Sequence, residues 1–398
     1  MLFLTTCISV FIAALFLSLL STVVSASSDP AFSGIAAKAN DSMSANLNPA
    51  GLARIKESEW TGQLIWFSSE STFDASDESL GGASTTEDSG DTVVPIVYYA
   101  RPLTDRLGFG FSFQGVSFSE DYGNGPQRYI AEEYTLTSIS FVPALGFQLD
   151  DKWSVGVGLS VNYSEFETKS AVFNGIGQPD GRFELDADDT DLGFTVGLVY
   201  ELSSRTRFGA RYQSESNPEL SGTPEYSNVV NPPDRREITI KNTFPQSVTV
   251  GVYHEFADRS WMTADLALID FSEFGFTEFR IGNKTIEARE QNFDDTWAIT
   301  AGHNYRFNDS WILKAGAIYI DQPVSDENRT STWRLDSMWG VGLGAEYAFS
   351  DKKMLAFNLN YMDLGNAPVD AGNGTVVGEF DERYAIILDV SFRWIIGD

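Results

Sequence analysis

The chain has 398 residues, a formal net charge of −29 and a single cysteine, Cys7. A surface this acidic repels phosphate backbones, which argues against nucleic acid as a partner. One cysteine in a chain of this length excludes a small scaffold held together by disulfides.

The N-terminus has the features of an export signal. Residues 1–26 contain no Lys, Arg, Asp or Glu, the run 11–20 is almost wholly apolar, and Val-Ser-Ala at 24–26 is a small-residue cleavage site. This pattern predicts a secretory signal peptide, and the apolar run is too short to span a bilayer comfortably as an anchor helix. No later stretch is apolar over the length of a membrane-spanning helix, which argues against a helical membrane protein.

Residues 27–55 come before the first predicted strand and show no strand alternation. They contain Asn48 and Pro49, and proline fixes φ and lacks an N–H, so Pro49 would set a bend. The segment is too long for a simple tail. We therefore predict a plug inside the fold formed by the rest of the chain, with a simple turn before the first strand as the alternative.

Residues 56–398 alternate with a period of two. Between 153 and 164 the odd positions are all apolar and the even positions are all small or polar, which is typical of a half-buried strand. The same pattern predicts about fourteen strands. Their approximate bounds are 58–69, 92–101, 106–118, 132–149, 153–168, 190–202, 206–215, 237–256, 260–280, 286–307, 311–321, 338–349, 354–363 and 381–395.

The connections between these strands alternate between short and long. A soluble β-sandwich also alternates along its strands, but short turns at one end and long loops at the other are typical of an outer-membrane barrel. The predicted fold is thus all-β, a transmembrane antiparallel up-and-down β-barrel with an N-terminal plug in its lumen, in the outer membrane of a Gram-negative-type bacterium. We expect the acidic residues to line solvated loops and a polar lumen. The short turns fall at 102–105, 149–152, 203–206, 257–260, 308–310 and 350–353, and the long segments at 70–91, 119–131, 169–190, 216–236, 322–337 and 364–380.

Aromatic residues flank the short turns, which suits an interfacial girdle. Proline is rare inside strands, so Pro95, Pro143 and Pro245 predict local irregularity or an exposed edge.

Three stretches together resemble one known family, the long-chain fatty acid transporter (FadL/OMPP1/TodX) family of outer-membrane proteins. The order and spacing of the three stretches along nearly the whole chain carry the resemblance. The stretches are 36–42 with 48–52 (Asn-Pro-Ala-Gly-Leu), then 244–248 (Phe-Pro-Gln-Ser-Val) with Gly251, 261–265 and 270–274 (Asp-Phe-Ser-Glu-Phe), and finally 297–346 with Gly302, Tyr305, Trp311, Gly316, 321–324 (Asp-Gln-Pro-Val), 328–330 (Asn-Arg-Thr), Trp339 and Gly344.

The resemblance implies passive transport of hydrophobic molecules, either long-chain fatty acids or aromatic hydrocarbons, by a monomer surrounded by outer-membrane lipid and lipopolysaccharide. It also implies an N-terminal hatch that shifts, and a sideways exit where the third strand is kinked. Gly115, which interrupts the alternation of Phe109, Phe111 and Phe113, is the candidate kink, because glycine in a strand often marks a bulge or bend. The hatch residues by this resemblance are Asn48, Pro49, Ala50 and Gly51.

The chain departs from the family in its surface loops. Segments 169–190 and 216–236 are short and polar where larger members have an apolar surface groove, and residues 333–336 read Trp-Arg-Leu-Asp where a Pro-Asp pair is usual. We therefore expect this groove to be reduced or absent.

A fatty-acid carboxylate needs a cation, and Arg211, Lys314 and Arg334 are the candidate contacts. No enzymatic activity is expected, because neither His254 nor His303 has a serine motif beside it. No metal or other cofactor is expected either, since the acidic residues at 186–191 lack the pattern of a calcium loop. The main alternative is a general diffusion porin for small polar solutes, and a third is an adhesin or purely structural barrel.

Overall fold

The computed structural model describes residues 27, 29–76, 84–121, 128, 132–233, 235–287, 292–326, 328–329, 335–370 and 377–397. The signal peptide predicted over residues 1–26 lies outside these ranges. Within them, no helix is both long and apolar enough to cross a membrane. The helical elements are short 3₁₀ turns, η1 (Pro30–Phe32), η2 (Ser42–Ala45), η3 (Pro49–Arg54) and η5 (Phe271–Glu273).

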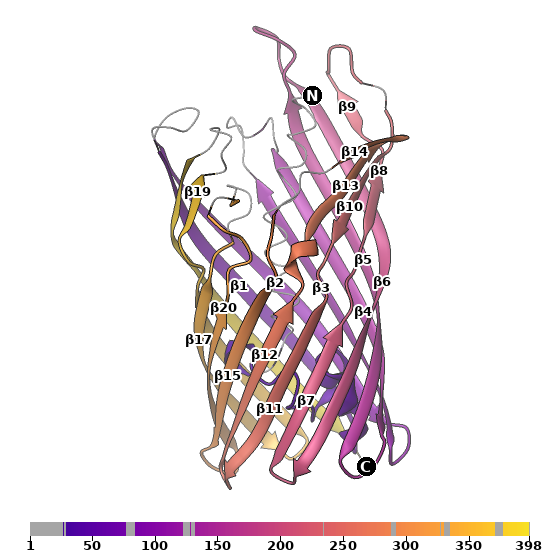
Figure 1. Cartoon of the computed structure of the whole chain (residues 1–398), viewed down its shortest axis with the longest axis vertical. Helices are drawn as coiled ribbons and strands as arrows, with labels where there is room; N and C mark the ends of the chain where they lie inside the picture. The colour runs from indigo at the N-terminus through magenta and orange to yellow at the C-terminus, as the bar shows by residue number, and fades with distance from the viewer. Residues whose placement is uncertain are drawn as a thin grey trace.

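Fourteen strands form a closed antiparallel barrel (Figure 1). The first strand, β1, pairs with β2 on one side and with the last strand, β20, on the other, so the barrel closes. The predicted fold class and strand number are confirmed. The strands of the wall are β1 (Ser58–Ala75), β2 (Ser84–Pro102), β3 (Leu107–Asp121), β4 (Glu133–Gln148), β5 (Trp153–Val172), β6 (Gly181–Ser203), β7 (Thr206–Gln213), β11 (Ser247–Ala257), β12 (Ser260–Ile269), β15 (Thr296–Arg306), β16 (Trp311–Ile320), β17 (Met338–Ser350), β18 (Lys353–Asp363) and β20 (Val377–Ile396).

Shorter strands extend the sheet at the loop end. The predicted strand 237–256 is two strands, because Pro245, which has no N–H to donate, lies between the end of β10 at Thr243 and the start of β11 at Ser247. The predicted strand 260–280 is likewise divided by η5, after which Gly275 takes a left-handed φ of 107°. The short strands are β8 (Glu219–Gly222), β9 (Glu225–Ser227), β10 (Ile238–Thr243), β13 (Gly275–Ile281), β14 (Lys284–Glu287) and β19 (Ala367–Asp370).

Two predicted loops are largely strand. The hairpin of β1 and β2 stays paired as far as Ala75 and Ser84, inside the predicted loop 70–91. The hairpin of β5 and β6 stays paired as far as Val172 and Gly181, inside 169–190. Their polar composition suggested loops, but strands that extend beyond the bilayer into water no longer need an apolar face.

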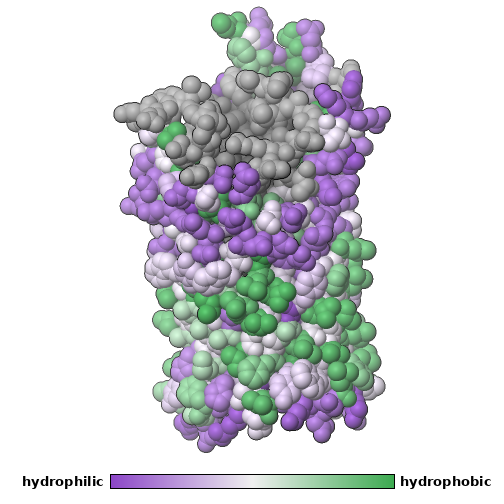
Figure 2. All heavy atoms as spheres, in the orientation of Figure 1, coloured by the Kyte–Doolittle hydropathy of each residue, from purple (hydrophilic) through white to green (hydrophobic). Residues whose placement is uncertain are grey.

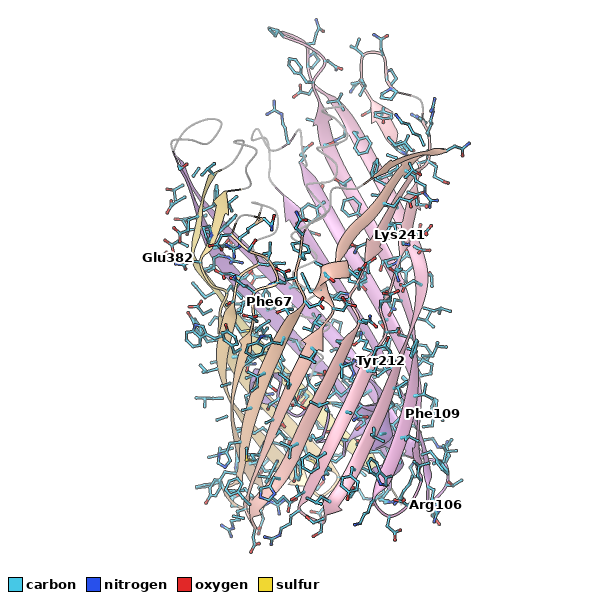
Figure 3. The ribbon with its side chains drawn as sticks, in the orientation of Figure 1. Phe67, Arg106, Phe109, Tyr212, Lys241 and Glu382 are labelled. Atoms are coloured by element: carbon cyan, nitrogen blue, oxygen red, sulfur yellow. The ribbon has the colours of Figure 1, made fainter. Side chains whose placement is uncertain are left out.

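The wall strands point alternate side chains inward and outward. Along β15, Thr296 and Thr300 are buried in the interior, whereas Trp297 and Ile299 lie outside and are exposed. Figure 2 shows the result on one face of the molecule, as an apolar zone across its lower half with hydrophilic surface above and below it. Arg106 lies at the turn end and Lys241 and Glu382 nearer the loop end (Figure 3).

Aromatic pairs mark both edges of this band. Trp311 and Tyr347 lie beside the turns, with ring centroids 4.8 Å apart, and Trp297 and Tyr319 lie toward the loops, 5.3 Å apart. Between Trp311 and Tyr319, β16 rises roughly 20 Å along the barrel axis. That height suits the apolar band of an outer-membrane barrel, and Trp311 lies at the turn end where the girdle is predicted.

Candidate functional site

The N-terminal segment (residues 29–55) lies inside the barrel, in the half nearest the turns (Figure 1). It rests on four glycines that are cross-strand neighbours, Gly108, Gly146, Gly156 and Gly197 on β3 to β6. A Cβ on any of them would collide with residues 48–53. The absence of side chains therefore makes a hollow in the wall that receives this part of the segment.

A second glycine row receives the start of the segment. Gly302, Gly316 and Gly342 are cross-strand neighbours on β15, β16 and β17. Side chains on them would collide with Pro30 or Ser33. The two rows place the segment across the lumen between opposite parts of the wall.

Polar side chains of the wall bind the backbone of the segment. Asp265 on β12 accepts hydrogen bonds from the backbone N–H groups of Gly34 at 2.7 Å, Ile35 at 3.1 Å and Ala36 at 2.9 Å. Asn360 on β18 accepts one from the N–H of Ala31 at 2.7 Å. These bonds satisfy donors that the short 3₁₀ turns leave free, away from bulk water.

Asn48 makes the reverse connection, from the segment to the wall. Its Nδ2 donates to the carbonyl oxygen of Ala36 at 2.6 Å, and to those of Leu198 on β6 at 3.2 Å and Ala210 on β7 at 3.3 Å. Its Oδ1 also caps the N–H of Ala50, which starts η3. Asn48 thus fixes the fold of the segment and its position at once.

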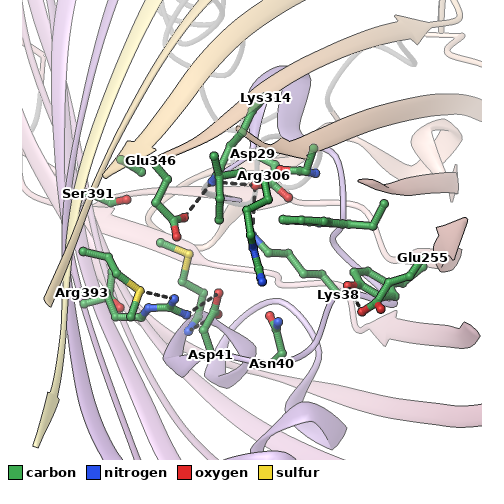
Figure 4. A pocket seen from close by; sticks show the side chains of 18 of the residues that line it. Asp29, Lys38, Asn40, Asp41, Glu255, Arg306, Lys314, Glu346, Ser391 and Arg393 are labelled. Atoms are coloured by element: carbon green, nitrogen blue, oxygen red, sulfur yellow. Dashed lines mark hydrogen bonds and ion pairs between the residues drawn. The ribbon is translucent and has the colours of Figure 1, made fainter. Parts of the chain in front are cut away.

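Four charged residues meet at the other end of the segment (Figure 4). Asp29 Oδ1 lies 3.0 Å from both Lys38 Nζ and Lys314 Nζ, and Lys314 Nζ also lies 3.1 Å from Glu346 Oε2. The side chains of Asp29 and Lys314 are almost fully buried. Burial alone would raise the pKa of Asp29, but the two ammonium groups outweigh it and lower the pKa to about 2.

A polar cavity of about 390 Å³ lies beside these charges, between the segment and the turn ends of the strands. Its lining includes both signs of charge, among them Lys38, Asp41, Arg306 and Arg393. At this end the lumen is polar, as expected from the acidic composition.

Toward the loops the lumen is apolar, and here the expectation of a polar lumen is wrong. Inward side chains of the wall, the short strands and the loop segments pack into one cluster, which we call the apolar lumen core. Ordinary diffusion barrels carry polar side chains on the inner face. The wall contributes Ile65, Phe67, Ile96, Tyr98, Tyr134, Phe166, Phe183, Leu185, Ala298, Ile318, Ile320, Met338, Met362 and Ile387, the short strands add Leu220, Ile238, Ile240 and Phe279, and Phe271, Phe274, Phe293, Val324, Leu335 and Leu364 close it at the loop end.

The wall has a seam between β2 and β3. Their ladder begins at Pro102 and Gly108 and ends at the pair Ile96 and Gln114. The next pair would be Pro95 and Gly115, where proline has no N–H to donate. Beyond this point β2 pairs only with β1, and β3 only with β4. Backbone groups of β2 and β3 that face the seam have no partner in the opposite strand. Such groups are energetically costly in a bilayer, because lipid offers them no hydrogen bonds.

Gly115, the candidate kink, therefore lies at the start of the seam. It is not a bulge against β4, since the β3–β4 register runs unbroken from Leu107 to Asp121. Pro143 coincides with a gap in the β4–β5 ladder, between Phe141 and Ala144. The irregularities predicted at the prolines are present, but only the one at Pro95 separates two wall strands over half their length.

The three candidate carboxylate contacts differ in their surroundings. Arg211 on β7 is buried in the lumen above the segment, where its Nη2 donates to Gln213 Oε1 at 2.6 Å and its Nε has no partner. Among the described residues no carboxylate pairs with it. Lys314 is engaged by Asp29 and Glu346. Arg334 lies outside the described residues.

The sequence did not single out Asp265, Asn360 or Glu346 as functional residues. Each sits at an inward position of an otherwise regular strand, and a charged or amide side chain at such a position is the signal that could have found them.

Taken together, a closed barrel with a lipid-facing apolar band, an internal N-terminal segment and an apolar lumen core defines an outer-membrane transport barrel. Residues 7–389 match the family model described as "Outer membrane protein transport protein (OMPP1/FadL/TodX)". The chain belongs to this family, and the resemblance stated from the sequence is confirmed, as is the location in the outer membrane.

Among curated proteins, the chain is 20% identical over 410 residues to the long-chain fatty acid transport protein of Escherichia coli O6:H1, covering 92% of this chain and 91% of that one. Among solved structures, a Pseudomonas aeruginosa FadL homologue superposes with a TM-score of 0.77 at 17% identity, covering 93% and 97% of the two chains. The toluene transporter TodX of Pseudomonas putida superposes with a TM-score of 0.66 at 17% identity, covering 92% and 99%. At these identities the structures establish the common fold.

Proposed function

We propose that this barrel takes up hydrophobic molecules passively, and that its main substrates are long-chain fatty acids. The observation that carries the proposal is the apolar lumen core, because the interior between the loops and the N-terminal segment is packed with Phe, Ile, Leu and Met side chains. Transfer of each CH₂ from water to such a lining is favourable by about 0.8 kcal/mol, so a long acyl chain needs no covalent chemistry to enter. A general diffusion porin would need a continuously wet lumen, which this lining disfavours.

Arg211 favours a fatty acid over an aromatic hydrocarbon. A buried guanidinium without a carboxylate partner is costly, and a ligand carboxylate would compensate it through charge-assisted hydrogen bonds. A hydrocarbon such as toluene has no group for this position. The acyl chain would extend from Arg211 into the apolar lumen core.

The exit that we propose is lateral, through the seam between β2 and β3. Pro95 and Gly115 mark the start of the stretch in which β2 and β3 no longer pair with each other, and Val93 and Phe113 next to them are exposed on the outer face. In this proposal the N-terminal segment acts as the hatch, with Asn48, Pro49, Ala50 and Gly51 holding its shape. Its displacement frees the lumen beneath Arg211.

The test compares two ligands of equal chain length, a radiolabelled C16 fatty acid and the corresponding fatty alcohol, on the purified barrel. We expect both to bind, and the Arg211→Met substitution to weaken the fatty acid about tenfold while leaving the alcohol within twofold. Arg211→Lys, which keeps the charge, is the matched control. Tight binding of toluene with no binding of either C16 ligand would overturn the fatty-acid assignment.

Planar-bilayer conductance tests the plug. The full-length barrel should be closed, and a variant lacking residues 27–50 should conduct. Steady conductance of the full-length protein without fatty-acid binding would instead indicate a diffusion porin.

A further inference from the structure

Two neighbouring hydroxyl groups inside the barrel are buried without a hydrogen-bond partner among the described residues. They belong to Tyr98 on β2 and Ser112 on β3, which are both 0% exposed. The two residues face each other in the β2–β3 ladder, so their Cβ atoms lie about 5 Å apart. Both side chains point into the lumen, because Val97 and Phe113 beside them are exposed on the outer face.

This pair lies between the N-terminal segment and the seam. On the turn side, the next inward pair of the ladder includes Gly110, where an added Cβ would meet Leu52 and Ala45 of the segment. On the loop side, the next inward pair is the last one before the seam begins. A ligand that passes from the lumen to the seam above a displaced segment would therefore cross the row of Tyr98 and Ser112.

The two hydroxyl groups are a cost to the fold rather than a support. A buried hydroxyl group without a partner has given up its hydrogen bonds to water and gained none in exchange, which is unfavourable. Native proteins contain few such groups, and each one needs an explanation. Phe at 98 and Ala at 112 would occupy the same positions without this cost. A ligand that supplies the missing partner explains why hydroxyl groups are present.

We propose that Tyr98 and Ser112 form a second binding site, which receives the oxygen-bearing head group of the ligand between Arg211 and the seam. A hydroxyl group both donates and accepts, so the pair can bind a carboxyl group in either protonation state, or an alcohol. A hydrocarbon without oxygen gains nothing at this site. The inference rests on the proposed function and its lateral exit, and it defines the ligands as amphiphiles with an oxygen at one end.

The test separates passage from binding. In the double variant Tyr98→Phe with Ser112→Ala, uptake of a radiolabelled C16 fatty acid by cells that carry the barrel should slow about tenfold, because the head group loses both contacts. Binding of this acid to the purified barrel should stay within twofold, since Arg211 is unchanged. Uptake of the C16 alcohol should slow as much as that of the acid, whereas Arg211→Met weakens the acid alone.

The matched control is Tyr99→Phe, which removes the same oxygen atom from the neighbouring residue of β2. The ring of Tyr99 packs against Trp60 on the outer face, with centroids 4.6 Å apart, so this hydroxyl group lies outside the lumen. Uptake by the control should stay within twofold of the parent. An equal loss of uptake in the control and in the double variant would overturn the proposal.

Melting temperature distinguishes a ligand contact from a structural role. Because the structure makes no use of either hydroxyl group, the double variant should melt at or above the temperature of the parent barrel. A lower melting temperature or weaker acid binding would overturn the proposal. Unchanged uptake would also overturn it, and is the result expected if an ordered water bridges the two groups. If the parent binds no C16 ligand, the proposed function and this inference fail together, whereas binding with unchanged uptake in the double variant defeats this inference alone.

Discussion

Asp265 Oδ2 accepts a hydrogen bond from the backbone N–H of Gly34 at 2.7 Å, although 231 residues separate the two along the chain. The same carboxylate takes the N–H groups of Ile35 and Ala36. Three donors of the N-terminal segment thus converge on one side chain of β12. This contact joins the start of the chain to the middle of the barrel.

Replacing Asp265 by Ala should release the segment. Three buried N–H groups would lose a charged acceptor, a loss of roughly 2 kcal/mol, which corresponds to about thirtyfold more displacement. The displacement is measured by thiol labelling of a cysteine placed at Ser33, which is buried against the wall while the segment is seated. Thr300→Val serves as the control, because Thr300 reaches Asp265 only at 3.4 Å and should change labelling little. Equal labelling of Asp265→Ala and the parent would show that this anchor is dispensable.

Adding one methyl group to the glycine hollow should also displace the segment. A Cβ at Gly156 would collide with the backbone of Pro49 and Ala50. We expect Gly156→Ala to destabilise the seated segment by roughly 1–3 kcal/mol and to raise bilayer conductance. Gly62→Ala is the matched control, since a Cβ there meets nothing within 4 Å. If neither variant raises conductance, the hollow accommodates the added methyl group and the collision at Gly156 does not displace the segment.

A covalent link across the seam should block lateral release. Cysteines at Pro95 and Gly115 would face each other at the first unpaired position between β2 and β3. Oxidation should abolish fatty-acid uptake but not binding, and a reductant should restore uptake. Cysteines at Val97 and Phe113, which are already a pair in the ladder, form the control link and should leave uptake intact. Undiminished uptake with the first link closed would mean that the substrate leaves by another path.

Acid should weaken the contact between Asp29 of the segment and Lys314 of the wall only at low pH. Asp29 has a pKa of about 2, below the ordinary 3.8. A lowered carboxyl pKa stabilises the closed state above the ordinary value, and this stabilisation is lost as pH falls toward the lowered one. Conductance attributable to Asp29 should therefore stay constant from pH 7 to about 4 and rise between about 4 and 2.

Comparison with Asp29→Asn isolates this contribution from the other charged groups around Asp29, which include Lys38, Asp41, Glu255, Arg306, Lys314, Glu346, Asp389 and Arg393. The substituted barrel should lack the acid-dependent increment. An increment of equal size in both proteins would assign the opening to another carboxylate.

The sequence was sufficient for the barrel but not for its interior. Alternation along each strand is a local property, so strand number and the lipid-facing side followed directly, and Pro95 and Gly115 were recognised as irregular. That they face each other depends on the register between two strands. The same applies to the lumen, where the apolar core is formed by inward positions of many strands that are far apart in sequence.

The candidate site showed the same limit. Arg211 and Lys314 were both identified as cations on strands, and nothing local distinguished them. Only the fold reveals that Lys314 meets Asp29 and Glu346, whereas Arg211 meets no carboxylate among the described residues. Residues such as Asp265 were missed because their partners are backbone groups, which have no signature in the sequence.

The location of the segment's anchors has a consequence for biogenesis. The segment precedes β1, yet Asp265, Lys314 and Asn360, which hold it, belong to β12, β16 and β18. A nascent barrel that has acquired only its early strands therefore lacks these three side chains, although the glycine row of β3 to β6 is already present. The segment can make its full set of wall contacts only after the C-terminal strands have joined the sheet, so its complete seating comes late in folding.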